Sequence, residues 1–137
     1  MPPKTTFEPL NVLVFTPTPT HPPIQGNRQR VFDLCRAMQS AGAEVTVLHY
    51  ATEGISPAAA REMREAWGDI EVVFPSGFVY GRSFVRWFGI DDWFDPKISI
   101  AAERLCETKQ FDVCVVNYAW YSKIFESLPR EVVRIID

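Results

Sequence analysis

The sequence is poor in the residues that build disulfide frameworks and metal centres. Three cysteines and two histidines occur in 137 residues. No C-x-x-C spacing is present, and Cys35, Cys106 and Cys114 each lie in an apolar run. We interpret them as reduced core residues of a cytoplasmic protein. The two histidines, His21 and His49, show no metal-ligand spacing, so we expect neither a metal nor a cofactor.

Several motifs of known chemistry are also missing. No G-x-G-x-x-G follows the first apolar run, and no G-x-x-x-x-G-K-[ST] is present, so neither dinucleotide binding nor a P-loop is favoured. The nucleophile elbow G-x-S-x-G is absent. The acidic pair that a phospho-acceptor receiver domain needs after its first strand is replaced by Thr16 and Pro17. The sequence therefore assigns no catalytic side chain.

An excess of positive charge is absent as well, with 14 lysines and arginines against 17 aspartates and glutamates. The net charge of −3 argues against a nucleic-acid partner, and 47% apolar with 23% charged residues is typical of a soluble globular domain. Residues 1–10 contain three prolines and one lysine but no apolar segment of a signal peptide. We expect residues 1–10 to form a flexible arm and residues 11–137 to form one domain.

Five short β-rich runs alternate with helical patterns along the rest of the chain. The first, fourth and fifth are nearly continuous apolar runs, which is typical of parallel strands that are covered on both faces. The predicted strands are Asn11–Thr16, Glu44–Tyr50, Ile70–Phe74, Asp112–Asn117 and Val132–Ile136.

The helices between these strands carry start and stop signals. We predict that Asn27 caps the first helix and that Gly42 ends it. Ser56 and Asp95 each precede a proline, which predicts two further helix starts. A shorter helix is expected over residues 119–128.

This alternation predicts a Rossmann-like, doubly wound α/β fold with a five-stranded parallel sheet in the order 3-2-1-4-5. Ligands then bind outside the carboxyl ends of the first and fourth strands, where the strand order reverses. In this chain the loop from Thr16 to Asn27 and the segment from Asn117 to Trp120 would line that crevice. Gly26 would allow close backbone approach at a helix start, where free amides suit phosphate or carboxylate.

The segment from Asn11 to Tyr50 resembles the beginning of a family 4 glycosyltransferase (glycosyltransferases group 1). Such enzymes begin with a strand, a loop with proline and glycine, an amphipathic helix, an A-x-G-x-E-V-T-type turn and a second strand. Here these features read N-V-L-V-F-T-P-T-P-T-H-P-P-I-Q-G-N-R, a helical segment and A-G-A-E-V-T-V-L-H-Y. The alternation of later elements up to Asp137 fits less specifically.

The resemblance implies a GT-B architecture, in which two Rossmann-like halves face each other across a cleft. This chain would be the N-terminal, acceptor-side half of a retaining glycosyltransferase, truncated at its C-terminus. The enzyme would transfer a sugar from a nucleotide diphosphate sugar to a saccharide or lipid-linked acceptor. The missing C-terminal half, with an E-x7-E motif, would be its partner, and the chain alone would be inactive. A free-standing Rossmann-like binding or protein-interaction module is the alternative.

The resemblance also places candidate donor residues. The glycine-containing loop after the first strand falls on Gly26, whose backbone would approach the donor diphosphate. Asn27, Arg28 and Arg30 could add hydrogen bonds and positive charge beside it. The alternative is that Gly26 supplies only a turn conformation and that both arginines face water.

On the acceptor side, the candidates are His21, Asn117, Tyr118 and Trp120. Some family members have a histidine just after the fourth strand, where this chain has Asn117 and Tyr118, so the catalytic side chain stays unknown. The aromatic residues could stack on an acceptor, or they could be packing residues of a short helix.

The segment 75–94 holds seven aromatic residues in twenty. Phe84, Trp87 and Phe88 have helical spacing and lie near two arginines, so they could contact a membrane surface or a lipid-linked acceptor. Packing against the domain or the missing half is the alternative. The expected location is the cytoplasm, with peripheral contact to the inner membrane face as an option.

Overall fold

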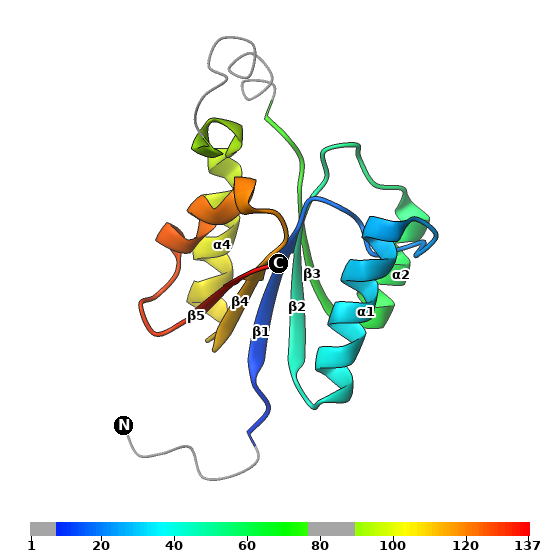
Figure 1. The fold of residues 1–137 in the computed structure, drawn as a ribbon, viewed down its shortest axis with the longest axis horizontal. Helices are drawn as coiled ribbons and strands as arrows, with labels where there is room; N and C mark the ends of the chain where they lie inside the picture. Colours follow the sequence, from blue (N-terminus) through cyan, green and yellow to red (C-terminus); the bar gives the residue numbers. More distant parts are fainter. Residues whose placement is uncertain (1–7, 77–89) are drawn as a thin grey trace.

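The fold is a five-stranded parallel sheet with helices on both faces (Figure 1). The computed structural model describes residues 8–76 and 90–137. The strand order is β3-β2-β1-β4-β5, which confirms the predicted order. The strands are β1 (Asn11–Thr16), β2 (Glu44–Tyr50), β3 (Asp69–Val73), β4 (Val113–Val116) and β5 (Val133–Ile136).

Two helical layers cover this sheet (Figure 1). Helices α1 (Gly26–Ser40) and α2 (Pro57–Trp67) lie on one face. Helix α4 (Pro96–Thr108) and the 3-10 segment η2 (Ala119–Ser127) lie on the other, and a short 3-10 turn, η1 (Ile90–Trp93), precedes α4. This arrangement follows from right-handed crossovers that run outward from β1 in both directions.

Alternate residues of β1 point into two separate cores, because successive side chains of a strand face opposite sides. Val12 and Val14 pack with Val31 of α1 and Met63 of α2. Leu13 and Phe15 instead pack with residues of α4 and η2, among them Ile98, Ala102 and Ile124. The four apolar residues of β1 are at most 4% exposed, so the predicted coverage of this strand on both faces is confirmed.

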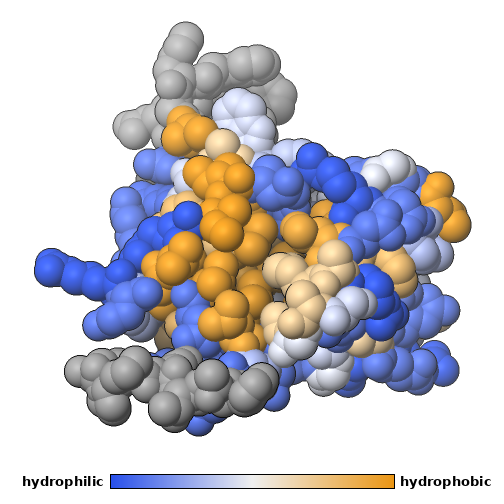
Figure 2. Space-filling model, turned by 60° about the horizontal axis from the view of Figure 1, so that its bottom comes forward, coloured by the Kyte–Doolittle hydropathy of each residue, from blue (hydrophilic) through white to orange (hydrophobic). Residues whose placement is uncertain are grey.

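Strand β5, which lies next to β4 at the edge of the sheet, is more exposed than predicted. Val133, Ile135 and Ile136 are 56%, 44% and 52% exposed, so the expectation that β5 is covered on both faces is wrong. The reason is that, among residues 8–76 and 90–137, β5 pairs with β4 alone and forms an edge of the sheet. Figure 2 shows apolar side chains gathered in a band on this side of the molecule.

Strand bounds agree closely with the prediction. The bounds of β1 and β2 are those predicted, and the other three strands differ by one residue at one or both ends. Gly42 ends α1 as predicted, with φ of 93°. The amides of Gly42 and Ala43 donate to the carbonyls of Gln39 (2.9 Å) and Met38 (3.0 Å), the two bonds of a Schellman motif.

The predicted cap at Asn27 is wrong. Helix α1 begins two residues earlier than a cap at Asn27 predicts, at Gly26, and Gln25 occupies the cap position with an extended backbone but no capping side-chain bond. Asn27 therefore lies inside the first turn, where its Oδ1 accepts from the amide of Arg28 at 2.9 Å. The start of α1 has no capping side chain and no acidic residue in its first turn.

The predicted short helix over residues 119–128 is a 3-10 segment, η2. Tyr118, just before it, has φ of 71°, the positive-φ non-glycine residue of the described chain. Such a conformation costs on the order of 1–3 kcal/mol and tends to occur at functional sites. The Tyr118 amide donates to the carbonyl of Asp137 at 3.1 Å, which ties the turn to the end of β5.

Burial of the cysteines agrees with their interpretation as reduced residues. All three are free thiols, and Cys35 and Cys114 are fully buried, whereas Cys106 is only partly buried. Burial raises the pKa of Cys35 and of Cys114 to about 12. Because the thiolate is the reactive form, these two side chains act as small core residues.

Phe84, Trp87 and Phe88, on which the prediction of membrane contact depends, lie outside the described residues. Within residues 8–76 and 90–137, none of the helices has both the length and the apolar character needed to cross a bilayer.

Asp95 is the main polar anchor of the connection into α4. The carboxylate is fully buried, and its Oδ1 accepts from the Lys97 amide at 3.0 Å, which confirms the predicted cap. Oδ2 accepts from the Tyr50 hydroxyl (3.0 Å) and from the amide and hydroxyl of Ser76 (2.8 and 3.2 Å). Burial alone would raise the pKa of Asp95, but these hydrogen bonds outweigh it and lower the pKa.

We predict that Asp95→Ala lowers the free energy of unfolding by roughly 2–3 kcal/mol, because it removes a cap and leaves buried donors unpaired. The matched control is Ser56→Ala, which removes the exposed cap of α2, a single bond from the Ala59 amide at 3.1 Å, and should cost about 1 kcal/mol. Urea unfolding at neutral pH measures both. Equal losses in the two variants would contradict the anchoring role of Asp95.

Candidate functional site

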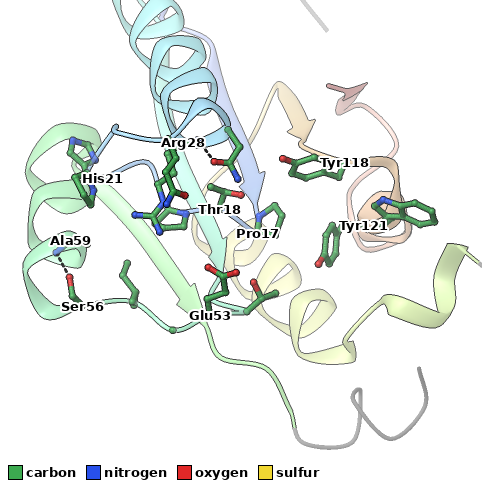
Figure 3. A pocket seen from close by; sticks show the side chains of 17 residues that line it. Pro17, Thr18, His21, Arg28, Glu53, Ser56, Ala59, Tyr118 and Tyr121 are labelled. Carbon is green, nitrogen blue, oxygen red and sulfur yellow. Dashed lines mark hydrogen bonds between the residues drawn. The ribbon is translucent and has the colours of Figure 1, made fainter. Parts of the chain in front are cut away.

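An open cleft of about 790 Å³ lies at the carboxyl ends of β1, β2 and β4 (Figure 3). Three loops line it: the one after β1, the one after β2, and the start of η2. Figure 3 shows His21 and Arg28 on one side, Tyr118 and Tyr121 on the other, and Pro17 and Thr18 between them. The cleft therefore occupies the crevice that the strand order predicted.

The loop after β2 is a part of the site that sequence reasoning missed. Thr52, Glu53, Ile55 and Ser56 line the cleft. A signal for it was present, because in the order 3-2-1-4-5 the end of β2 must lie beside the end of β1. Glu53 brings a carboxylate into a cleft whose opposite charge comes from Arg28.

The first turn of α1 forms one wall. Asn27 and Arg28 line the cleft, and Gly26 lies between two lining residues, Gln25 and Asn27. Gly26 does not have a positive φ, and a Cβ added there would meet no atom within 4 Å. The turn-conformation alternative therefore lacks support, since neither the backbone nor the packing of the chain requires glycine here.

Three of the candidate residues do not line the cleft: Gly26, which lies between two residues that do, and Arg30 and Asn117. The Arg30 guanidinium pairs with the Asp137 carboxylate at 3.1 Å and lies 6.0 Å from the ring centre of Tyr118. Asn117 is fully buried, and its Nδ2 donates to the Phe15 carbonyl at 2.9 Å. The structure thus leaves Arg30 outside the cleft with its side chain 51% exposed, as the alternative that the arginines face water expected, and it buries Asn117.

Aromatic side chains form the wall opposite α1. Trp120 is 53% exposed and lines the cleft, so the packing alternative is not supported for this residue. Tyr118 lines the cleft and is half-buried. Tyr121, which sequence reasoning missed, packs its ring 4.9 Å from that of Phe15 and 5.8 Å from that of Tyr50. A ligand in the cleft can pack against the aromatic rings of this wall.

His21 is held by an aromatic cluster at the far end of the cleft. Its ring lies 5.2 Å from Phe32 and 5.9 Å from Trp67, and Nδ1 is 2.9 Å from the Thr20 hydroxyl. The same hydroxyl accepts from the indole N–H of Trp67 at 2.8 Å. Burial lowers the pKa of His21, which favours the neutral imidazole at neutral pH.

His49 lies fully buried at the end of β2. Its Nδ1 is 3.0 Å from the Thr16 carbonyl, which accepts, so Nδ1 carries the proton of the neutral ring. Nε2 has no partner among the described residues. Among the described residues, the buried His49 ring is therefore hydrogen-bonded through one nitrogen only.

A search against models of known protein families finds no match to this sequence, and a search of curated proteins finds none either. Within the described part of the chain, no three His, Cys, Asp or Glu side chains are grouped so as to hold a metal ion. The described residues that line the cleft bring to it the Arg28 guanidinium, the Glu53 carboxylate, the His21 imidazole and aromatic rings, beside the first turn of α1, in which the Arg28 amide already donates to Asn27 Oδ1.

We predict that His49 makes stability dependent on pH. Burial is the main cause that lowers its pKa below 6.5, so the unfolded chain binds the proton more readily than the folded one. The contribution of His49 to the free energy of unfolding of the wild type is fully present above pH 6.5, and it falls as the pH drops toward the pKa of the folded state. Each unit by which folding lowers the pKa of His49 corresponds to about 1.4 kcal/mol of unfolding free energy that is lost once the pH is below both pKa values.

The measurement is urea unfolding of the wild type and of His49→Gln between about pH 7.5 and pH 5. His21 titrates in both proteins, so the difference between them isolates His49. The advantage of the wild type should shrink as the pH falls. An advantage that stays constant across this range would show that the ring does not titrate as a buried group.

Proposed function

We propose that this chain is the acceptor-side half of a retaining glycosyltransferase, which transfers a sugar from a nucleotide diphosphate sugar to a saccharide or lipid-linked acceptor. The resemblance of residues 11–50 to family 4 glycosyltransferases supports this proposal. The observation that carries it is the start of α1, which opens beside the cleft without a capping side chain and next to Arg28.

The donor side of the proposal rests on electrostatics. The N-terminus of a helix carries a partial positive charge and free amide donors, which suit a phosphate group. Arg28 adds a full charge on the same wall of the cleft. Stabilising the departing diphosphate is the main electrostatic task of sugar transfer, and groups fixed in place before the reaction perform it best.

The acceptor side rests on the opposite wall. Trp120, Tyr118 and Tyr121 present aromatic rings, on which the apolar faces of a sugar can pack. Glu53 and His21 add hydrogen-bonding groups at the edges of the cleft. A cleft with ring faces and a few polar groups fits a saccharide better than a purely apolar ligand.

The remaining parts of the proposal concern the partner half and the location of the protein. A second Rossmann-like half would supply further donor contacts, and Phe84, Trp87 and Phe88 would provide peripheral contact with the inner membrane face. Reading the parent gene beyond Asp137 tests the first part. An in-frame half with E-x7-E supports the transferase, whereas a stop codon favours a free-standing binding module.

We predict that Gly26→Ala weakens binding of UDP without destabilising the fold. Alanine at this helical position meets no neighbouring atom, so stability should stay equal or rise by up to about 1 kcal/mol. A methyl group would, however, hinder a diphosphate that approaches the backbone. An NMR titration of the chain with UDP, with uridine as the ligand that lacks phosphate, measures the shifts of the Gly26, Asn27 and Arg28 amides.

Arg28→Gln should also weaken UDP binding, by about tenfold, since it removes a charge-assisted contact. The matched control is Arg61→Gln, which makes the same charge change at an exposed position of α2 that does not line the cleft. Equal effects of the two substitutions, or amide shifts that uridine reproduces, would contradict a diphosphate site at α1.

A further inference from the structure

Two buried polar atoms of opposite hydrogen-bonding character lie unpartnered beside the cleft. The first atom is Arg28 Nε, which is a donor. The second is His49 Nε2, which is an acceptor in the neutral ring, as argued below, and belongs to a fully buried side chain. Neither atom has a partner among the described residues. An unpaired buried polar group costs about 1–3 kcal/mol, so a pair of them calls for a physical explanation.

The hydrogen-bonding role of His49 follows from its other nitrogen. Nδ1 lies 3.0 Å from the Thr16 carbonyl, which can only accept, and therefore Nδ1 is the protonated nitrogen. In the neutral ring, Nε2 is then an acceptor. Burial keeps the ring neutral by lowering its pKa.

The position of Arg28 brings its donor to the same part of the fold. Arg28 lies on the first turn of α1 over the loop after β1, and it lines the cleft together with Pro17 and Thr18 (Figure 3). Thr16, whose carbonyl holds the His49 ring, is two residues before Thr18. His49 lies two residues after Val47, which packs in the same core as Val31 of α1, so alternation along β2 places the His49 ring on the face of the sheet that α1 covers. The positive charge of Arg28 is also among the causes that lower the pKa of His49.

We propose that His49 is a positioning residue for Arg28, and that one internal water molecule links them by accepting from Arg28 Nε and donating to His49 Nε2. The bridging molecule must both accept and donate. A water molecule does both, whereas the oxygens of an ionised diphosphate can only accept. The diphosphate is therefore left to the terminal nitrogens of the guanidinium.

The consequence is a preorganised cation. A guanidinium fixed at Nε loses less side-chain entropy when it binds an anion than a freely rotating one does. The role in diphosphate binding rests on the proposed function, whereas the water bridge itself does not. Loss of the bridge should weaken UDP binding about three- to tenfold and leave the cleft otherwise intact.

The test is NMR of the full chain without ligand. In the wild type, the Nε–H proton of Arg28 should exchange slowly and show a cross-relaxation signal to a long-lived water. In His49→Phe, which keeps an aromatic ring but removes the acceptor, this signal should disappear. In His49→Gln, whose amide oxygen can accept, it should be partly restored. The Nε–H proton of the exposed Arg61 serves as the internal reference.

A water signal that is missing in the wild type, or that persists in His49→Phe, would overturn the bridge. Where His49→Phe fails to fold, the wild-type signal and the His49→Gln variant still decide the question. UDP titration of the same proteins separates the two proposals. A bridge together with unchanged UDP affinity in His49→Phe overturns the positioning role, and a bridge without UDP binding in any protein contradicts the proposed function alone.

Discussion

The central position of β1 is the constraint from which the site follows. This strand pairs with β2 on one side and with β4 on the other, and its apolar residues fill the cores on both faces of the sheet. Because the crossovers leave it in opposite directions, the loops after β1 and β4 diverge, and a cleft opens where they part. The apolar pattern of one short segment, Val12–Phe15, therefore determines where a ligand can bind.

At the same edge, the apolar interior gives way to a buried polar layer. Thr16 ends β1, His49 is the last residue but one of β2, and Asn117 follows β4. All three are fully buried. Interior positions of this kind are normally satisfied by hydrogen bonds, yet His49 Nε2 and Asn117 Oδ1 have no partner among the described residues. The rest of the fold tolerates this cost because two apolar layers and the Asp95 anchor hold the strands independently of the cleft.

Much of the fold could be predicted because its signals are local. Ser56 and Asp95 before proline predicted two helix starts, and Gly42 predicted the end of α1. The errors concern features that depend on neighbours. The apolar run of β5 could not reveal that it lies at an edge, and Asn27 could not reveal that Gln25 occupies the cap position. The candidate site was predicted on two of its three loops. The alternation of side chains along β2 does not reveal which group lies against His49. Glu53 could be placed in the cleft only by applying the strand order to the loop after β2.

The most direct test of the account is a crystal structure of the chain soaked with UDP. We predict that the diphosphate lies against the backbone amides at the start of α1, within hydrogen-bond reach of the Arg28 guanidinium, with the cleft wall of Tyr118 and Trp120 facing it. UDP bound at another surface, or in the cleft with its phosphates pointing away from α1, would contradict the claim that this helix start is an anion site.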